Sequence, residues 1–128
     1  MANELILIVE DNEMNRKLAR DVLQFKGYRT LEAETGEAGV ELAIERKPDL
    51  ILMDYQLPGI DGIEAFRRIR ADATTAHIPI VAVTASAMPE EALKMKEAGF
   101  DGFQTKPLNL KAFMQAVAEV FSGKAGKK

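Results

Sequence analysis

The stretch LILIVED, residues 5–11, joins an unbroken apolar run to two acidic residues. Two later stretches also join an apolar run to a polar residue, since LILMD at residues 50–54 ends in Asp54 and IVAVT at residues 80–84 ends in Thr84. Continuous apolar runs of this length are typical of strands buried on both faces, as in a parallel sheet covered by helices. The three stretches therefore predict the centre of a parallel sheet.

Weaker strands and helical segments complete the pattern. Two further strands are predicted at residues 28–32 and 102–105. Apolar residues recur at helical spacing in five segments, which are residues 14–25, a segment beginning near residue 35, one beginning near residue 61, residues 89–98 and residues 110–121. Strict alternation of strand and helix implies right-handed crossovers between parallel strands. We therefore predict an α/β fold, a doubly wound five-stranded parallel sheet flanked by five helices.

The first helical segment carries a clear apolar period. Met14, Leu18, Val22 and Phe25 recur at spacings of four, four and three residues. We interpret this stripe as a helix face and Met14 as a core or helix-face residue.

Length and charge limit the class of protein. The 128 residues suit one domain, expected over residues 1–123 with a flexible basic tail at 124–128. A net charge of −3 does not favour nucleic-acid binding. The absence of cysteine excludes disulfides, thiol catalysis and zinc–thiolate sites. No apolar stretch reaches the length of a membrane span, so we expect a cytoplasmic protein without a membrane partner.

Chemically active side chains follow the predicted strands. Glu10 and Asp11 follow the first strand, Asp54 ends the third, Thr84 ends the fourth and Lys106 follows the fifth. In doubly wound sheets, ligands bind beyond the carboxyl ends of the strands. We therefore expect these five side chains to lie at one edge of the sheet.

The three carboxylates at this edge indicate a metal. Carboxylates that are crowded together repel one another, and a divalent cation removes that repulsion. Mg²⁺ prefers oxygen ligands and needs only one or two carboxylates from the protein. The chain has no cysteine, and its one histidine, His77, precedes the fourth strand and so lies away from this edge. A Mg²⁺ site is the natural interpretation.

Mg²⁺ sites with few protein ligands commonly serve phosphate groups. Phosphoryl transfer needs mainly positioning and neutralisation of charge. Mg²⁺ and Lys106 would each take one phosphoryl oxygen, and the Thr84 hydroxyl with the Ala85 backbone N–H would take the third. Asp54 remains as the nucleophile, since carboxylates form aspartyl phosphates.

Each residue also has a simpler interpretation. Glu10 and Asp11 could cap the first helix, Asp54 could be a turn residue, and Lys106 an ordinary surface lysine. The joint placement of all four favours the functional interpretation.

Five short motifs occur in order along the chain. They are VEDN at 9–12, LMD at 52–54, LPGIDG at 57–62, VTA at 83–85 and TKP at 105–107. Over residues 4–121 the chain resembles the receiver domains of two-component response regulators, which have a flavodoxin-like fold. The stretch EDNEMNR at 10–16 is similar to stand-alone receivers of the DivK type and to receivers within hybrid histidine kinases.

The resemblance implies roles for individual residues. Asp54 would be the phosphoacceptor. Glu10, Asp11 and Asp54, with the backbone carbonyl of Gln56, would hold Mg²⁺. Lys106 would pair with a phosphoryl oxygen, and its bond to Pro107 would be cis.

The resemblance also implies a switch. Thr84 would bond the phosphoryl group and move inward on activation, together with Phe103. This aromatic position is often Tyr in the family, and Phe103 has no hydroxyl to donate. We therefore expect packing alone to couple Phe103 to Thr84.

The expected function is that of a single-domain response regulator that is not an enzyme in its own right. It would accept a phosphoryl group from a histidine kinase or a histidine phosphotransfer protein. It would then signal through a downstream protein on the face formed by the fourth helix, fifth strand and fifth helix, or pass the phosphoryl group on. A monomer or weak dimer that binds no nucleic acid is expected.

Four alternatives stay open. The domain could come from a hybrid histidine kinase. A haloacid-dehalogenase-type phosphatase would need a second Asp two residues after Asp54, where Gln56 stands. In a flavodoxin-like flavin carrier, Glu10 and Asp11 would repel the flavin phosphate. The complete set of acidic, Thr and Lys residues argues against a pseudo-receiver that acts only as a scaffold.

Overall fold

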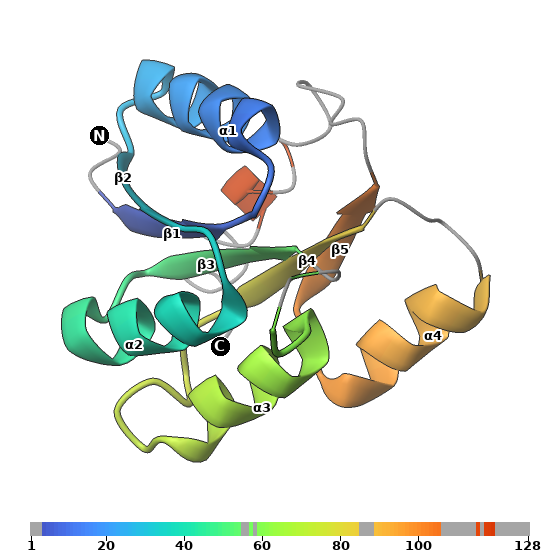
Figure 1. Cartoon of the computed structure of the whole chain (residues 1–128). Coiled ribbons are helices and arrows are strands. Elements are labelled where there is room, and N and C mark those ends of the chain that lie inside the picture. The colour runs from blue at the N-terminus through green and yellow to red at the C-terminus, as the bar shows by residue number, and fades with distance from the viewer. Residues whose placement is uncertain are drawn as a thin grey trace.

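A computed structural model describes residues 4–54, 57, 59–84, 89–105, 115 and 117–119. Strands and helices alternate along the chain (Figure 1). Their bounds are β1 Leu5–Val9, α1 Glu13–Phe25, β2 Arg29–Ala33, α2 Gly36–Arg46, β3 Leu50–Asp54, α3 Gly62–Ala71, β4 Ile80–Thr84, α4 Pro89–Ala98 and β5 Gly102–Thr105.

The strands form one parallel sheet in the order β2-β1-β3-β4-β5. The strand order reverses between β1 and β3, as a doubly wound topology requires. This confirms the predicted fold class and all five strands. Of the fifth helix predicted at 110–121, residues 115 and 117–119 are helical and the others lie outside the described residues.

Two apolar clusters pack on opposite faces of the sheet (Figure 1). Alternate residues of β1 divide between them, with Leu7 and Val9 facing α2 and α3, and Ile6 and Ile8 facing α1 and Val117. β3 divides in the same way. Each central strand is therefore buried on both faces, which explains its continuous apolar run.

The predicted bounds of the second strand are wrong by one residue. β2 is Arg29–Ala33 rather than 28–32. The backbone N–H of Tyr28 donates to the Leu23 carbonyl at 3.1 Å, so Tyr28 belongs to the turn that ends α1. At the other end, the Ala33 carbonyl accepts from the Glu10 N–H at 3.0 Å, which extends the pairing beside the site.

Of the two predicted places for Met14, core or helix face, the core is wrong. Met14 is 79% exposed and Phe25 86% exposed, whereas Ala19 and Leu23 are buried. At about 100° per residue, Ala19 and Leu23 lie roughly 140–180° around the helix from Met14. Met14, Leu18 and Phe25 therefore face away from the sheet, whereas Val22 of the same stripe packs against the apolar cluster. The small Ala19 lets α1 pack closely on the sheet.

None of the helices in the described part of the chain is long and apolar enough to span a bilayer.

Candidate functional site

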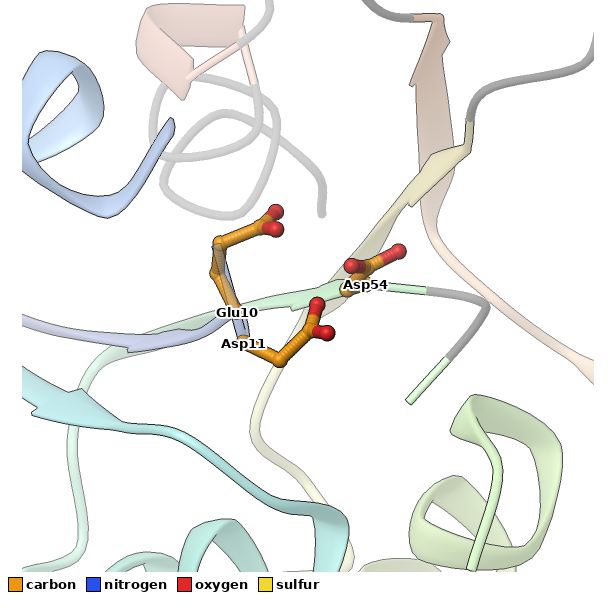
Figure 2. Close-up of side chains that lie close together, drawn as sticks. All are labelled: Glu10, Asp11 and Asp54. Carbon is orange, nitrogen blue, oxygen red and sulfur yellow. The ribbon is translucent and has the colours of Figure 1, made fainter. Parts of the chain in front are cut away.

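Three carboxylates meet at the carboxyl ends of β1 and β3. Val9 and Met53 are register partners in the sheet, so the next residues along, Glu10 and Asp54, lie side by side. Asp11 follows in the turn that leads to α1. One carboxylate oxygen from each of Glu10, Asp11 and Asp54 lies within 4.8 Å of the others. Figure 2 shows the three side chains directed into the same space.

Two of these carboxylates are buried. Glu10 is 5% exposed and Asp54 is 3% exposed, whereas Asp11 is exposed. A carboxylate removed from water is costly to keep ionised unless opposite charge or hydrogen bonds compensate. Part of this compensation is local, since Glu10 Oε2 accepts from the Asn12 backbone N–H at 3.2 Å.

Glu10 and Asp11 are not the cap of the first helix. Asn12 holds the N-cap position of α1, and its side-chain oxygen accepts from the Asn15 N–H at 2.9 Å. The helix terminus is therefore satisfied without either acidic residue. This removes the simpler interpretation of the pair.

The donor set fits a hard divalent cation. Opposite oxygen ligands of Mg²⁺ lie about 4.2 Å apart, which is comparable with the 4.8 Å limit on the separation of the carboxylate oxygens. Two of the three carboxylates come from strand ends held by the sheet, and the third from the adjoining turn. The cluster could therefore hold an ion of this class with little movement of the backbone.

The backbone of Thr84 lies at the same edge of the sheet. Asp54 pairs with Val83 in the sheet register, so Thr84 is one residue further towards the carboxyl end of β4. Thr84 in turn pairs with Thr105, the last residue of β5, and Phe103 pairs with Ala82. The structure therefore brings the ends of β1, β3, β4 and β5 to one edge, as the sequence predicts.

Several predicted site residues lie outside the described residues. They are Gln56, Ala85 and Lys106, with the Lys106–Pro107 bond and the tail at 124–128. The side chains of Thr84 and Phe103 are likewise outside the description. Their roles stay predictions.

The loop after β3 is tied to α2. Glu37 on α2 accepts a hydrogen bond from the Ile60 N–H at 3.3 Å. Gly59 has φ 77°, and a Cβ there would lie 2.7 Å from the Glu37 carboxylate oxygens. The positive φ favours glycine at this position, and the Glu37 contact joins Ile60 to α2.

One residue beside the site had no predicted role. Arg16 on α1 donates from Nη1 to the Glu10 carbonyl oxygen at 3.0 Å. Its Nε pairs with Glu32 at 3.1 Å, and its Nη2 lies 3.6 Å from Glu34. A basic residue in the first turns of a helix is unfavourable, because its charge opposes the helix dipole. Its position in the sequence could therefore have indicated that Arg16 has a specific partner.

Arg20, one turn further along α1, shares Glu32. Its Nη1 lies 3.0 Å from Glu32 Oε2. Hydrogen bonding to Glu32 raises the pKa of Arg20, so this guanidinium stays charged. In the described part of the chain, Glu32 thus joins two arginines of α1 to β2.

Comparison with known proteins identifies the family. The family model of the response regulator receiver domain matches residues 6–118. The chain is 39% identical over 112 residues to the polar-differentiation response regulator DivK of Brucella anthropi, covering 88% of this chain and 91% of that protein. DivK of Brucella ovis matches with the same identity and coverage.

Solved structures agree with the sequence matches. The receiver domain of the sensor histidine kinase PA1611 from Pseudomonas aeruginosa, solved with a magnesium ion coordinated in the active site cleft, superposes with a TM-score of 0.85 at 34% identity, covering 95% of this chain and 99% of that one. A putative response regulator from Chloroflexus aurantiacus superposes with a TM-score of 0.89 at 28% identity, covering 94% and 98%. The sheet order, the acidic cluster and these matches agree, and the chain belongs to the family of response regulator receiver domains.

Proposed function

We propose that this receiver domain accepts a phosphoryl group on Asp54 in a reaction that depends on Mg²⁺. One observation carries the proposal, namely that the carboxylates of Glu10, Asp11 and Asp54 converge within 4.8 Å at the carboxyl edge of the sheet. Receiver domains are signalling domains, so the phosphoryl group on Asp54 would be a signal rather than an intermediate in the turnover of a substrate.

Glu10, Asp11 and Asp54 would hold the Mg²⁺, with the Gln56 carbonyl as a further ligand. The magnesium ion in the cleft of the Pseudomonas aeruginosa receiver domain supports this assignment. The bound ion would supply positive charge against the phosphoryl oxygens and against the crowded carboxylates. Few protein ligands leave room for water and for a phosphoryl oxygen around such an ion.

Asp54 would act as the nucleophile. One of its carboxylate oxygens attacks the phosphorus of a phosphohistidine in line with the bond that breaks. A new O–P bond forms on Asp54 as the N–P bond breaks, and the released imidazole takes up a proton. Lys106 would neutralise charge on a phosphoryl oxygen, while the Thr84 hydroxyl and the Ala85 N–H would donate to another.

The response would rest on Thr84 and Phe103. An aspartyl phosphate at position 54 carries roughly two negative charges where the ionised carboxylate carried one, and Thr84 is one residue beyond the register partner of Asp54. Contacts to the phosphoryl group would favour an inward Thr84 and Phe103 and change the face formed by α4, β5 and the fifth helix. This face would bind the downstream protein.

The phosphodonor would dock on α1 beside the site. Met14, Leu18 and Phe25 form an exposed apolar stripe on this helix, and Met14 lies two residues after the N-cap Asn12. Exposed apolar stripes of this kind mark protein–protein contacts. A histidine kinase or histidine phosphotransfer protein that covers the stripe would bring its phosphohistidine over the carboxylates.

The mode of action has two candidate forms. The DivK relatives favour a response regulator that acts through protein contacts, and the Pseudomonas aeruginosa neighbour favours a receiver that belongs to a sensor kinase. The site chemistry is the same in both. We also propose that the protein is cytoplasmic.

The test is incorporation of phosphate from a small phosphodonor. The protein is incubated with acetyl phosphate and Mg²⁺, and intact mass is measured. We expect one added phosphoryl group in the wild type, none in Asp54→Asn, and none in the wild type with excess chelator.

Asp61→Asn is the matched control. Asp61 caps α3 through a 2.9 Å hydrogen bond from the Glu64 N–H, and Asn caps equally well. This variant should be phosphorylated like the wild type. Stoichiometric incorporation into Asp54→Asn would exclude Asp54 as the acceptor.

A further inference from the structure

The peptide that joins Glu10 to Asp11 links two of the three carboxylates of the candidate metal site. The Glu10 N–H is held by the Ala33 carbonyl at 3.0 Å, at the end of the β1–β2 pairing. The carbonyl of Glu10 accepts from Arg16 Nη1 at 3.0 Å. The orientation of this peptide determines where the Asp11 side chain leaves the backbone, and Arg16 constrains that orientation.

Arg16 is itself held in place. Its side chain is only 12% exposed, and its Nε donates to Glu32 Oε1 at 3.1 Å. The guanidinium is planar and rigid, so a contact at Nε to β2 also directs Nη1. Its own backbone N–H donates to the Asn12 carbonyl at 2.9 Å, which closes the first turn of α1 over the loop at 10–12.

We propose that Arg16 is a positioning residue for the metal site, which orients the Glu10–Asp11 peptide so that both carboxylates face Asp54. This inference rests on the proposed Mg²⁺ site. Arg16 would act without touching the ion, through its hydrogen bond to the backbone between two of the metal ligands.

Loss of the Arg16 charge and loss of its positioning contact should change the affinity for Mg²⁺ in opposite directions. Removing a positive charge near three carboxylates should leave their attraction for a cation equal or slightly greater. Loss of positioning should instead weaken cation binding, by about ten-fold when a hydrogen bond that orients the metal ligands is removed. The direction of the change in affinity therefore separates the two effects.

Arg20 provides the matched control. It lies one turn along α1 and pairs with the same Glu32 at 3.0 Å. The hydrogen bonds described for Arg20 are to Asp21 and Glu32, and none of them is to the Glu10 carbonyl. Each of Arg16→Met and Arg20→Met removes one positive charge and an ion pair with Glu32. Each also removes a second ion pair, with Glu34 for Arg16 and with Asp21 for Arg20. Only Arg16→Met removes the contact to the Glu10 carbonyl.

The experiment is calorimetric titration of MgCl₂ into wild type, Arg16→Met and Arg20→Met, without a phosphodonor. Thermal melting in chelator serves as a separate measure of the fold. We expect the Kd for Mg²⁺ to rise about ten-fold in Arg16→Met and to stay equal or fall slightly in Arg20→Met. The melting temperature in chelator should fall to a similar extent in both.

Equal Kd values in the two variants, or an unchanged Kd in Arg16→Met, would overturn the role of Arg16. A wild type that binds no Mg²⁺ would instead overturn the proposed metal site on which the inference rests. If Arg16→Met does not fold, Arg16→Lys is titrated in its place. Lys keeps the charge but not the planar fork, so its Kd should still exceed that of the wild type, and a Kd equal to the wild type would reject the positioning role.

Discussion

Asp54 combines two properties at the scale of a single residue. It is 3% exposed, and its carboxylate lies in a group of three. The other four residues of β3 are apolar and buried, so Asp54 is the one charged residue of the strand. A buried carboxylate beside two others lowers the stability of the fold, and such arrangements are typical of functional sites.

Asp11→Asn should separate repulsion from metal binding. In metal-free protein the substitution removes one of three crowded charges, so the melting temperature should rise. The gain in the free energy of unfolding should be at most about 1 kcal/mol, because Asp11 is exposed to solvent. With Mg²⁺ the same substitution removes a ligand, so the rise in melting temperature on adding the ion should shrink. Thermal melting with chelator and with MgCl₂ measures both effects.

Glu41→Gln is the control for this comparison. Glu41 is an exposed residue of α2 outside the acidic cluster. Glu41→Gln should change the metal-free melting temperature less than Asp11→Asn does. It should also change the rise in melting temperature on adding Mg²⁺ less than Asp11→Asn does. A lower metal-free melting temperature in Asp11→Asn would contradict repulsion within the cluster.

Thr84→Ala should leave phosphorylation of Asp54 largely intact and reduce the structural change that follows it. The Asp54 nucleophile and the carboxylates are untouched, so incorporation from acetyl phosphate should stay within about three-fold of the wild type, since only one donor to the phosphoryl group is lost. The structural change that follows phosphorylation should be reduced, because the hydroxyl that would report on the phosphoryl group is gone. Amide hydrogen exchange over α4 and β5, with and without acetyl phosphate, measures this response. A full response in Thr84→Ala would show that Thr84 is not part of the switch.

At the scale of the elements, α2 approaches β1 closely through Gly39. A Cβ at Gly39 would lie 2.8 Å from Val9 Cγ2 and 3.0 Å from Val9 Cγ1. In an open helix, replacement of Gly by Ala stabilises by about 0.5–1 kcal/mol. Here we expect Gly39→Ala to destabilise by about 1–3 kcal/mol, because the new methyl group overpacks the core against Val9.

Denaturant unfolding of the double variant Gly39→Ala/Val9→Ala tests the cause. Shortening Val9 provides room for the methyl group, so the double variant should be more stable than the sum of the single changes predicts. Strict additivity of the two changes would show that the Val9 contact is not what excludes Ala.

The exposed stripe of α1 should matter for the protein donor and not for the small donor. Met14 and Phe25 are both highly exposed, so Met14→Gln and Phe25→Gln should fold normally. They lie about 16 Å apart along the helix, and Met14 is at the end beside the site. We expect Met14→Gln to slow transfer from a phosphorylated histidine phosphotransfer protein about five-fold, with phosphorylation by acetyl phosphate unchanged.

Phe25→Gln is the matched comparison and should have the smaller effect. If Met14→Gln slowed both donors equally, the stripe would act through the site rather than through docking.

The sequence predicted the strands well where both faces are buried. β1, β3 and β4 are continuous apolar runs because helices cover both sides of the sheet. β2 is an edge strand of mixed character, R-T-L-E-A, and its bounds depend on the Tyr28 turn contact rather than on hydropathy. The apolar period of α1 does not identify its buried face, because the large residues Met14 and Phe25 dominate the period, whereas Ala19 and Leu23 are the buried residues.

The candidate site was predictable only in part. Glu10, Asp11 and Asp54 follow apolar runs, and parallel topology brings such positions to one edge. The contact between Arg16 and the Glu10 carbonyl depends on the path of the turn at 10–12, which residue types alone do not define.

At the scale of the whole molecule, the chemistry and the packing occupy different parts of the fold. The two apolar clusters lie on the faces of the sheet, and the carboxylates lie at its carboxyl edge. The helices that follow β1 and β3, α1 and α3, lie on opposite faces of the sheet (Figure 1). The edge can therefore carry like charges because the core does not depend on it. Under the proposed function, this edge is where the receiver domain would take up its phosphoryl group.

The central claim is that Asp54 carries the phosphoryl group. Reduction of the phosphorylated protein with borohydride converts a β-aspartyl phosphate into homoserine, and peptide sequencing by mass spectrometry then locates it. We expect homoserine at position 54 alone, formed only when both acetyl phosphate and Mg²⁺ were present. Homoserine at another aspartate, or phosphate retained elsewhere with Asp54 unchanged, would contradict it.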